Sequence, residues 1–380
     1  MIIIVILLVT LNLILWGAVC GYKISYKVTV ITSAVLVALI IGAIIILAVG
    51  DDVFNTYWII ISMPFKNLRS FSEVLIRMIP LLIIALGISV SSRCGIINIG
   101  AEGQMYMGII AATAIATNCG SLPKIILVPM CIVAAGIAGG LYGFIPGWLK
   151  AKLEVSELLS TVMLNYVATQ FFNFCIRVPL LDPNEKSGTP MSRRIAENAT
   201  LSRLFRGMSL HQGIFLAIIL VVIIYLLMFK TTWGYKMRAA GASSRAARYG
   251  GINVSKYLII AMVISGACAG MAGAVELMGV QGRAVAGMTS GYGFSGVVVA
   301  LFGALHPLWI VPASFFFGIL LYSQVNLQIL TSVPPNLVKA LQGLIILIIV
   351  AVQMVISNPY SMERFRRRFF SKANTAKKEA

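Results

Sequence analysis

Long runs of apolar residues, separated by short polar segments, dominate this chain of 380 residues. Most runs approach the roughly 20 apolar residues that a helix needs to cross a bilayer. We expect helical spans at about 1–20, 29–49, 73–92, 96–118, 124–147, 158–176, 213–229, 257–280, 289–305, 308–329 and 337–357. The pattern predicts an all-α integral membrane protein, a polytopic bundle of about ten or eleven transmembrane helices, depending on whether residues 1–20 form a true span.

The basic residues test this arrangement, because cytoplasmic loops of membrane proteins are enriched in Lys and Arg. Residues 230–256 contain several basic residues and no acid: Lys230, Lys236, Arg238, Arg245, Arg248 and Lys256. We therefore place this segment, and the basic tail at 358–380, in the cytoplasm, and residues 177–212 outside. The net charge of +18 is carried by such short segments, which is typical of membrane loops and does not indicate a nucleic-acid partner.

Composition narrows the class of protein further. Hydrophobic residues make up 59% of the chain and charged residues 11%, with a mean hydropathy of +0.95, which excludes an ordinary soluble protein. The 6 cysteines are scattered and only 2 histidines are present, so we expect no metal centre. No phosphate-binding loop of the type G-x-x-x-x-G-K-[ST] occurs. No catalytic set lies at membrane depth either, and we expect no enzyme activity and no cofactor in this chain.

A glycine-rich interruption at residues 95–104 is the sharpest local feature. It places Asn98, Glu102 and Gln104 at membrane depth, where buried polar groups face a partner or a watery cavity. One interpretation is a re-entrant turn that lines a translocation path. The other is a structural junction, in which Glu102 caps backbone amides or pairs with Arg93. Both interpretations remain open on the sequence.

A similar interruption at residues 287–296 in the second half suggests a weak internal repeat. Each interruption precedes a small-residue apolar stretch and then a proline, Pro123 in the first half and Pro307 in the second. Paired broken segments in the two halves of a transporter indicate the position of its central pathway.

The cytoplasmic segment 238–252 contains a stretch of small, helix-forming residues between glycines. We predict a short helix at 242–249, with Ser243 or Ser244 as the residue that caps its N-terminus. The segment is either an ordinary basic loop or a docking element for a cytoplasmic partner, and its length and small-residue face favour docking.

Three motifs together resemble a known family: G-I-I-N-I-G-A-E-G-Q (95–104), R-A-A-G-A-S-S-R-A-A-R-Y-G-G-I-N (238–253) and G-Y-G-F-S-G-V-V-V-A-L-F-G (291–303). They are similar to the ABC-importer permeases of the ribose and branched-chain amino-acid superfamily, most closely to the simple-sugar and nucleoside branch. The resemblance covers about residues 29–357. Residues 1–28, an extra span with a basic loop, and the tail at 358–380 lie outside it.

The resemblance implies a permease subunit in the bacterial cytoplasmic membrane, with its C-terminus inside. Its expected partners are a cytoplasmic ATPase that uses ATP and Mg, a second permease subunit and an extracytoplasmic binding lipoprotein. Two sets of residues follow from it. Candidates for the solute path are Asn98, Glu102, Gln104, Tyr292 and Phe294. The segment at 238–252 becomes a coupling helix that contacts the ATPase through Arg245 and Arg248, with Ala242, Ala246 and Ala247 on the close-packed face and Gly250 at its end.

The alternative is a secondary transporter of a small polar solute, driven by an ion gradient, since such proteins also use repeats and broken helices. A transporter of that class more often carries several intramembrane acids. This chain offers mainly Glu102, with Glu276 near the outer end of its span, so the sequence favours the ABC permease.

Overall fold

The computed structural model describes residues 40–44, 46–47, 50, 52–183, 190–205, 207–330 and 343. The spans expected at 1–20, at most of 29–49 and at 337–357, and the basic tail, lie outside these residues. Residues Pro64–Tyr322 form one compact unit, and the residues before Pro64 together with those after Tyr322 form another. Within the latter unit, Asp52 caps helix α3 by accepting a hydrogen bond from the Phe54 amide at 2.9 Å.

Helices account for every expected span between 73 and 329, and no strand forms among the described residues. They are α3 (Val53–Ser62), η1 (Met63–Phe65), α4 (Leu68–Arg93), α5 (Ala101–Asn118), α6 (Lys124–Leu153), α7 (Glu157–Arg177), η2 (Glu197–Ala199), α8 (Gly213–Lys230), α9 (Thr232–Ala242), α10 (Ser244–Tyr249), α11 (Val254–Glu276), η3 (Leu277–Gln281), α12 (Tyr292–Phe302) and α13 (Pro307–Leu330). The all-α membrane bundle predicted from the sequence is confirmed.

Five of these helices are long and apolar enough to cross a membrane, judged by length and composition: α4, α6, α8, α11 with η3, and α13. The apolar part of α4 is 89% buried, whereas only 33% of α8 is buried although its mean hydropathy is higher. Ile218, Val222 and Ile223 on α8 are half exposed. Exposed apolar side chains on an apolar helix are what a lipid-facing surface requires, so α4 is an interior helix and α8 a peripheral one.

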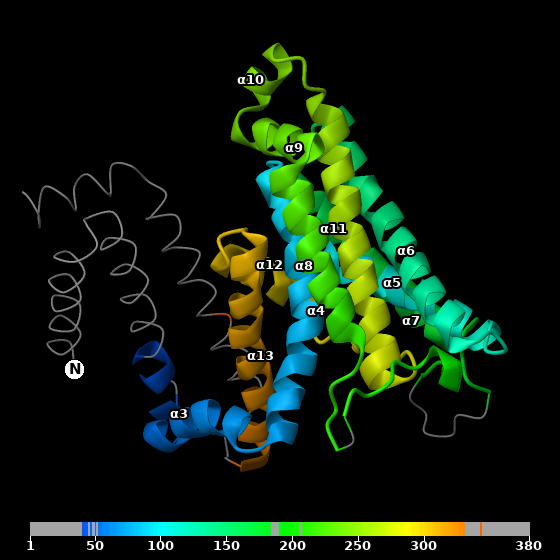
Figure 1. The fold of residues 1–380 in the computed structure, drawn as a ribbon, viewed down its shortest axis with the longest axis vertical. Helices are drawn as coiled ribbons and strands as arrows, with labels where there is room; N and C mark the ends of the chain where they lie inside the picture. The colour runs from blue at the N-terminus through cyan, green and yellow to red at the C-terminus, as the bar shows by residue number, and fades with distance from the viewer. Residues whose placement is uncertain are drawn as a thin grey trace, which may run out of the picture. The chain divides into compact units, whose positions relative to one another are not determined.

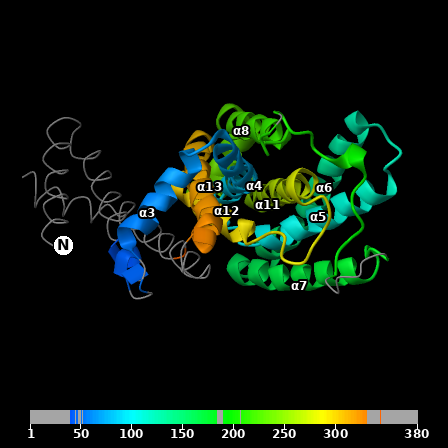
Figure 2. The same ribbon diagram turned by 90° about the horizontal axis from the view of Figure 1, so that it is seen from below.

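Helix α11 lies at the centre of the unit Pro64–Tyr322, where it contacts α4, α5 and α6. Figure 2 shows it between these helices, with α7 and α8 on opposite sides. Glycines bring α11 and α6 into backbone contact: a Cβ atom at Gly139 would collide with the carbonyl of Gly266. In lipid, close packing of small residues holds helices together because no hydrophobic drive acts between them. The sequence spaces these glycines as G-x-x-x-G on both helices, at 139–143 of α6 and 266–270 of α11, and this spacing serves the contact.

The segment between α7 and α8 is tied to the ends of several helices. Its Ala196 amide donates to the Ala116 carbonyl of α5 at 3.1 Å, and its Leu201 amide donates to the Met278 carbonyl of η3 at 3.0 Å. In most loops such backbone groups are hydrogen-bonded to water. Here they are paired with other backbone groups, which hold the segment against the helix ends.

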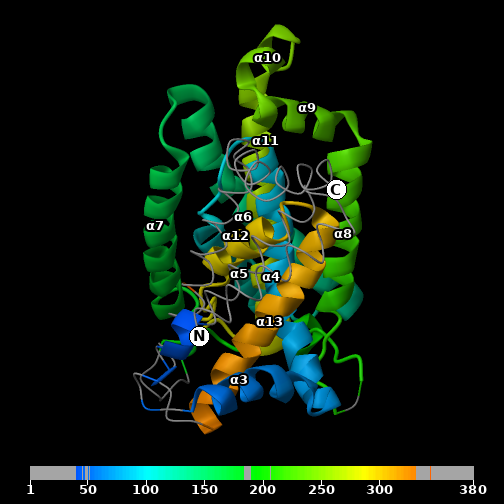
Figure 3. The ribbon, with the colours of Figure 1, turned by 90° about the vertical axis from the view of Figure 1, so that its left-hand side faces the viewer.

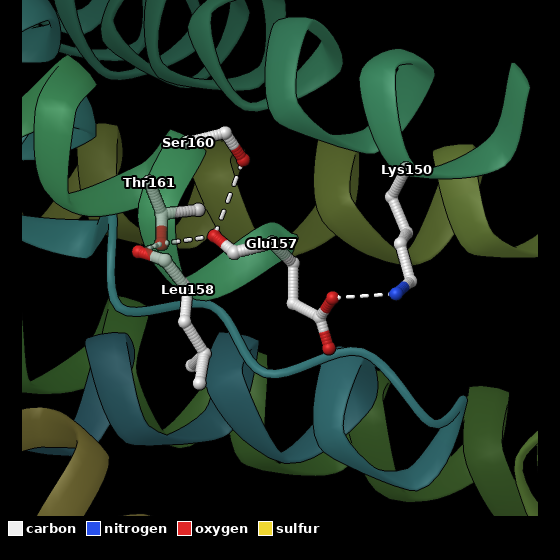
Figure 4. A network of polar contacts seen from close by, with 5 residues as sticks. All are labelled: Lys150, Glu157, Leu158, Ser160 and Thr161. Carbon is white, nitrogen blue, oxygen red and sulfur yellow. Dashed lines mark hydrogen bonds and ion pairs between the residues drawn. The ribbon is translucent and has the colours of Figure 1, made fainter. Parts of the chain in front are cut away.

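At the opposite end, α6 and α7 are joined by an ion pair between Lys150 and Glu157, with 2.7 Å between the two charged atoms. The backbone carbonyl of Glu157 also accepts hydrogen bonds from the Thr161 hydroxyl at 2.6 Å and from the Ser160 hydroxyl at 3.2 Å. Figure 4 shows this cluster at the start of α7. It fixes the turn at which the chain re-enters the bundle.

Two expected spans differ from the helices in the structure. The span predicted at 96–118 begins only at Ala101, and the span predicted at 289–305 is the short helix α12. In both cases glycines interrupt the helix: Gly95 has a φ of +88° and Gly291 a φ of +80°. Glycine adopts this left-handed conformation without the steric cost that other residues meet.

Candidate functional site

The break before α5 is a buried network centred on Asn98, which is fully buried. Its Nδ2 atom donates to Gln104 Oε1 at 2.7 Å and to Ser265 Oγ at 2.8 Å. Its Oδ1 atom accepts from the Gly100 amide at 2.9 Å and from Gln104 Nε2 at 3.2 Å. Asn98 therefore uses its hydrogen-bonding capacity inside the chain, as buried polar groups require.

Asn165 of α7 supports the same break from the other side. It accepts a hydrogen bond from the Gly103 amide at 2.8 Å and donates to the Ile99 carbonyl at 3.0 Å. Sequence reasoning missed both Asn165 and Ser265. A polar residue inside an otherwise apolar span was the signal that could have identified them, since such residues normally face another part of the bundle.

Glu102 joins the two glycine-rich breaks. Its Oε2 atom accepts a hydrogen bond from the Gly293 amide at 2.7 Å, and its Oε1 atom accepts one from the Thr289 hydroxyl. The Thr289 hydroxyl also lies 2.8 Å from the hydroxyl of Tyr106. A carboxylate at a helix N-terminus satisfies free amides and interacts favourably with the helix dipole. Glu102 is thus the cap of the short helix α12.

The pairing of Glu102 with Arg93, one of the two structural alternatives, does not occur. The Arg93 Nε atom donates instead to the Leu305 carbonyl at 2.6 Å. The close approach of the two breaks depends on Gly293, because a Cβ atom there would collide with the backbone of Glu102. The prediction that Glu102 caps backbone amides corresponds to the geometry.

Tyr292 and Phe294, at the start of α12, differ in their surroundings. Tyr292 is 5% exposed and is hydrogen-bonded to Arg77 of α4. Phe294 is 47% exposed. Glu276, which is also buried, is hydrogen-bonded to Gln281 and faces Arg77. Among the five residues expected along the solute path, Phe294 alone offers a largely accessible side chain.

A short helix is present where one was predicted at 242–249, although it is shorter than expected and separate from α9; its coupling role remains a prediction. Ala242 is the last residue of α9, and α10 covers Ser244–Tyr249. Ser243 lies between the two helices, and its hydroxyl accepts a hydrogen bond from the Ala246 amide at 3.3 Å. The N-cap expected at Ser243 or Ser244 is therefore Ser243. Figure 1 shows α10 beyond the ends of the long helices.

The exposure of the coupling residues corrects one expectation. Exposed positions on this segment are Ala242, Arg245, Ala246, Arg248 and Gly250. Ala247, in contrast, is 5% exposed and packs against its own chain, so it cannot form part of a face offered to a partner. Of the three alanines, α10 contains Ala246 and Ala247, and neighbouring residues of a helix point in different directions, so one faces outward and the other inward.

Two ends of the bundle can now be distinguished. At one end lie the last turn of α4, the last turn of α8, α9 and the α12–α13 connection, joined through Arg93, Phe229 and Leu305. At the other end, the segment between α7 and α8 contacts the end of α5 and η3. A bundle of membrane-length apolar helices with an exposed segment at one end defines the class of the protein, a polytopic integral membrane protein.

Comparison with known proteins gives the family. Residues 70–350 match the family described as "Branched-chain amino acid transport system / permease component". The guanosine ABC transporter permease protein NupP of Bacillus subtilis is 34% identical over 317 residues, which cover 83% of this chain and 91% of the relative. The nucleoside ABC transporter permease protein NupB of Lactococcus lactis is 33% identical over 340 residues, which cover 87% and 92%.

A sugar permease is similarly related: the glucose ABC transporter permease protein TsgB13 of Haloferax volcanii is 32% identical over 339 residues, which cover 86% of this chain and 87% of the relative. No solved structure matches. The chain belongs to the branched-chain amino acid transport system permease family. It is an ABC transporter permease subunit of the multi-pass membrane type, and the expected resemblance to the simple-sugar and nucleoside branch is confirmed.

Proposed function

We propose that this permease imports nucleosides across the cytoplasmic membrane. The observation that carries the proposal is its similarity, over more than four fifths of the chain, to permeases named for guanosine and for nucleosides. An exposed aromatic side chain at the start of α12, Phe294, suits a nucleobase, which binds by stacking. Hexose transport is the second candidate, because the glucose permease relative has nearly the same identity.

The proposed subunit works with three partners: a cytoplasmic ATPase that uses ATP and Mg, a second permease subunit and an extracytoplasmic binding lipoprotein. The exposed arginines of α10, Arg245 and Arg248, support contact with an acidic groove of the ATPase. The basic, acid-free character of residues 230–256 supports a cytoplasmic position for α10, and the same reasoning gives a cytoplasmic C-terminus.

Uptake by cells that express the complete transporter tests the solute. Radiolabelled guanosine uptake should be abolished by excess unlabelled nucleosides and unaffected by glucose. No uptake of labelled guanosine, together with uptake of labelled glucose, would instead support the second candidate.

The alternative of an ion-gradient transporter is tested separately. Proteoliposomes that contain this chain alone should show neither ATP hydrolysis nor uptake under a proton or sodium gradient. Uptake by the isolated chain under a gradient would exclude the proposed dependence on an ATPase.

A further inference from the structure

A cluster of cations lies where α4, α8 and α9 meet, at the end of the bundle that carries α10. The guanidinium carbon of Arg93 is 5.1 Å from the centre of the Phe229 ring, and that of Arg238 is 5.0 Å from the same centre. The imidazole ring of His306 is also 5.0 Å from Phe229, centre to centre. One aromatic ring therefore holds two arginines and a histidine, and stacking on its face stabilises each guanidinium.

Among the described residues, no carboxylate forms an ion pair with either arginine. From residue 198 to residue 362 the sequence contains one acid, Glu276, and it lies at the opposite end of α11, bonded to Gln281. The carboxylate of Glu102 is engaged by Gly293 and Thr289. Within the described part of the chain neither arginine has an ion pair, and the buried Nε atom of Arg238 has no hydrogen-bond partner. A nearby like charge disfavours the charged form of each arginine, and an anion bound to both would relieve this repulsion.

The position of the cluster along the helix axes indicates which kind of anion it binds. Phe229 is in the last turn of the apolar helix α8, and Arg93 is the last residue of the apolar helix α4. Figure 3 shows α9 lying across the ends of the long helices, with α10 projecting beyond it. Trp233 and Tyr235 of α9 are 50% and 63% exposed, and such side chains are enriched at the headgroup level of a bilayer.

The cluster also lies between the glycine-rich break at 95–104 and helix α10. Gly241 of α9 packs directly on the α4 terminus, since a Cβ atom there would collide with the Arg93 carbonyl. The break at 95–104 follows Arg93 in the chain, and α10 follows Gly241. Repulsion between Arg93 and Arg238 therefore acts across the contact that holds the coupling segment to the bundle.

From this geometry we propose that Arg93 and Arg238 form a binding site for the phosphate of an anionic phospholipid of the cytoplasmic leaflet. Arg93 and Arg238 offer their terminal N–H groups, since the Nε atom of Arg93 is bonded to Leu305 and that of Arg238 is buried. Planar guanidinium groups bind phosphate in a bidentate manner. The bound lipid neutralises the pair and holds α9 against the end of α4. Burial, and secondarily Arg93, lower the pKa of His306.

A lipid phosphate fits this site better than a carboxylate of the ATPase or a free phosphate ion. A carboxylate of the ATPase would approach α10, which Figure 3 shows farther from the bundle than α9. A free phosphate ion would not require the site to lie beside exposed Trp233 and Tyr235. Basic pockets between helices on the cytoplasmic side are a known type of site for anionic headgroups.

The test uses the purified full-length protein in phosphatidylcholine nanodiscs with and without phosphatidylglycerol. Phosphatidylglycerol should raise the thermal unfolding temperature of the wild-type protein, and native mass spectrometry should show it retained. Each of Arg93→Gln and Arg238→Gln should weaken this lipid's affinity about fivefold, the effect of one charge near the membrane surface. Arg238→Lys keeps the positive charge without the planar guanidinium group, and it should lose less lipid affinity than Arg238→Gln.

The matched control removes the same charge from α10. Arg245→Gln with Arg248→Gln should change lipid affinity by clearly less than Arg93→Gln with Arg238→Gln. Equal losses of lipid affinity would show diffuse electrostatic attraction and overturn the proposed site. Equal stabilisation by inorganic phosphate in pure phosphatidylcholine would show that the site binds free phosphate and not a lipid headgroup. Unchanged lipid binding together with lost co-purification of the ATPase would assign the arginines to the protein partner. None of these measurements depends on which solute is transported, so the lipid site and the proposed function can fail independently.

Discussion

The break at residues 95–104 and the segment at residues 238–252 are both rich in glycine and small residues, yet they occupy opposite environments. In the break, Asn98, Glu102 and Gln104 are buried and hydrogen-bonded to other parts of the chain. In the other segment, Arg245 and Arg248 are exposed and extend from a helix of a single turn. The first segment is bonded to the interior of the bundle, and the second lies at its surface.

This difference changes how the first motif should be understood. A buried polar residue in a membrane protein is by default a candidate for the solute path. Here the donors and acceptors of Asn98 are matched by Gly100, Gln104 and Ser265, so contact with a solute would first have to break these bonds. The motif therefore acts as a junction that fixes the position of α12. Substitutions in the two segments should consequently affect different quantities.

Glu102→Ala should have the largest effect on stability. It removes the acceptor for the Gly293 amide and for Thr289 in a buried site, where an unsatisfied group costs about 1–3 kcal/mol each. We expect a loss of about 3 kcal/mol in the free energy of unfolding, measured by denaturation in detergent. Glu102→Gln is the control, because its carbonyl oxygen still accepts a hydrogen bond. Full stability of Glu102→Ala with lost uptake would return Glu102 to the solute path.

Gly293→Ala should follow. The added methyl group meets the backbone of Glu102, which cannot move aside like a flexible side chain, and overpacking of this kind costs about 1–3 kcal/mol. The same denaturation measurement applies. Gly287→Ala has a different origin of strain, a positive φ with open space around the added atom, and serves to separate collision from backbone strain. An unchanged Gly293→Ala variant would contradict the close contact between the two breaks.

Asn165→Ala should cost somewhat less, about 1–2 kcal/mol, because it leaves the Gly103 amide and the Ile99 carbonyl without their partner. Asn165→Asp retains the acceptor for Gly103 and loses the donor to Ile99. A double-mutant comparison with Gln104→Ala should show coupling, since both residues support one break. Strict additivity would show that the two sides of the break are independent.

Ala246→Trp should have the smallest effect on stability among these changes. Ala247→Trp, at the neighbouring buried position, is its contrasting variant. Ala246 is exposed, so its replacement should change the free energy of unfolding by less than about 0.5 kcal/mol and should block the proposed contact with the ATPase, seen as lost solute-stimulated ATP hydrolysis. Ala247 is buried, so the same change there should destabilise the segment itself. Normal coupled hydrolysis by the Ala246→Trp transporter would contradict the docking role of α10.

Several features of the site could be predicted from particular residues. The glycines at 95, 100 and 103 indicated a break, and the serine at 243 indicated a helix start, because these residue types have local conformational preferences. Asn165 and Ser265 could not be assigned, since their partners are 62 and 167 residues away in the chain. Nor could the direction of Ala247, which depends on how one turn of helix packs against its own chain.

The amino-acid sequence by itself determined the membrane class, the spans that the structure describes and the family, because apolar length, charge distribution and motif spacing are local properties. Tertiary structure alone decided that the glycine-rich break is hydrogen-bonded to α7 and α11 and that Glu102 caps α12. It also decided that Arg93 and Arg238 share one aromatic ring. Each of these contacts joins residues far apart in the chain, and only the packed bundle brings their atoms within hydrogen-bonding or stacking distance.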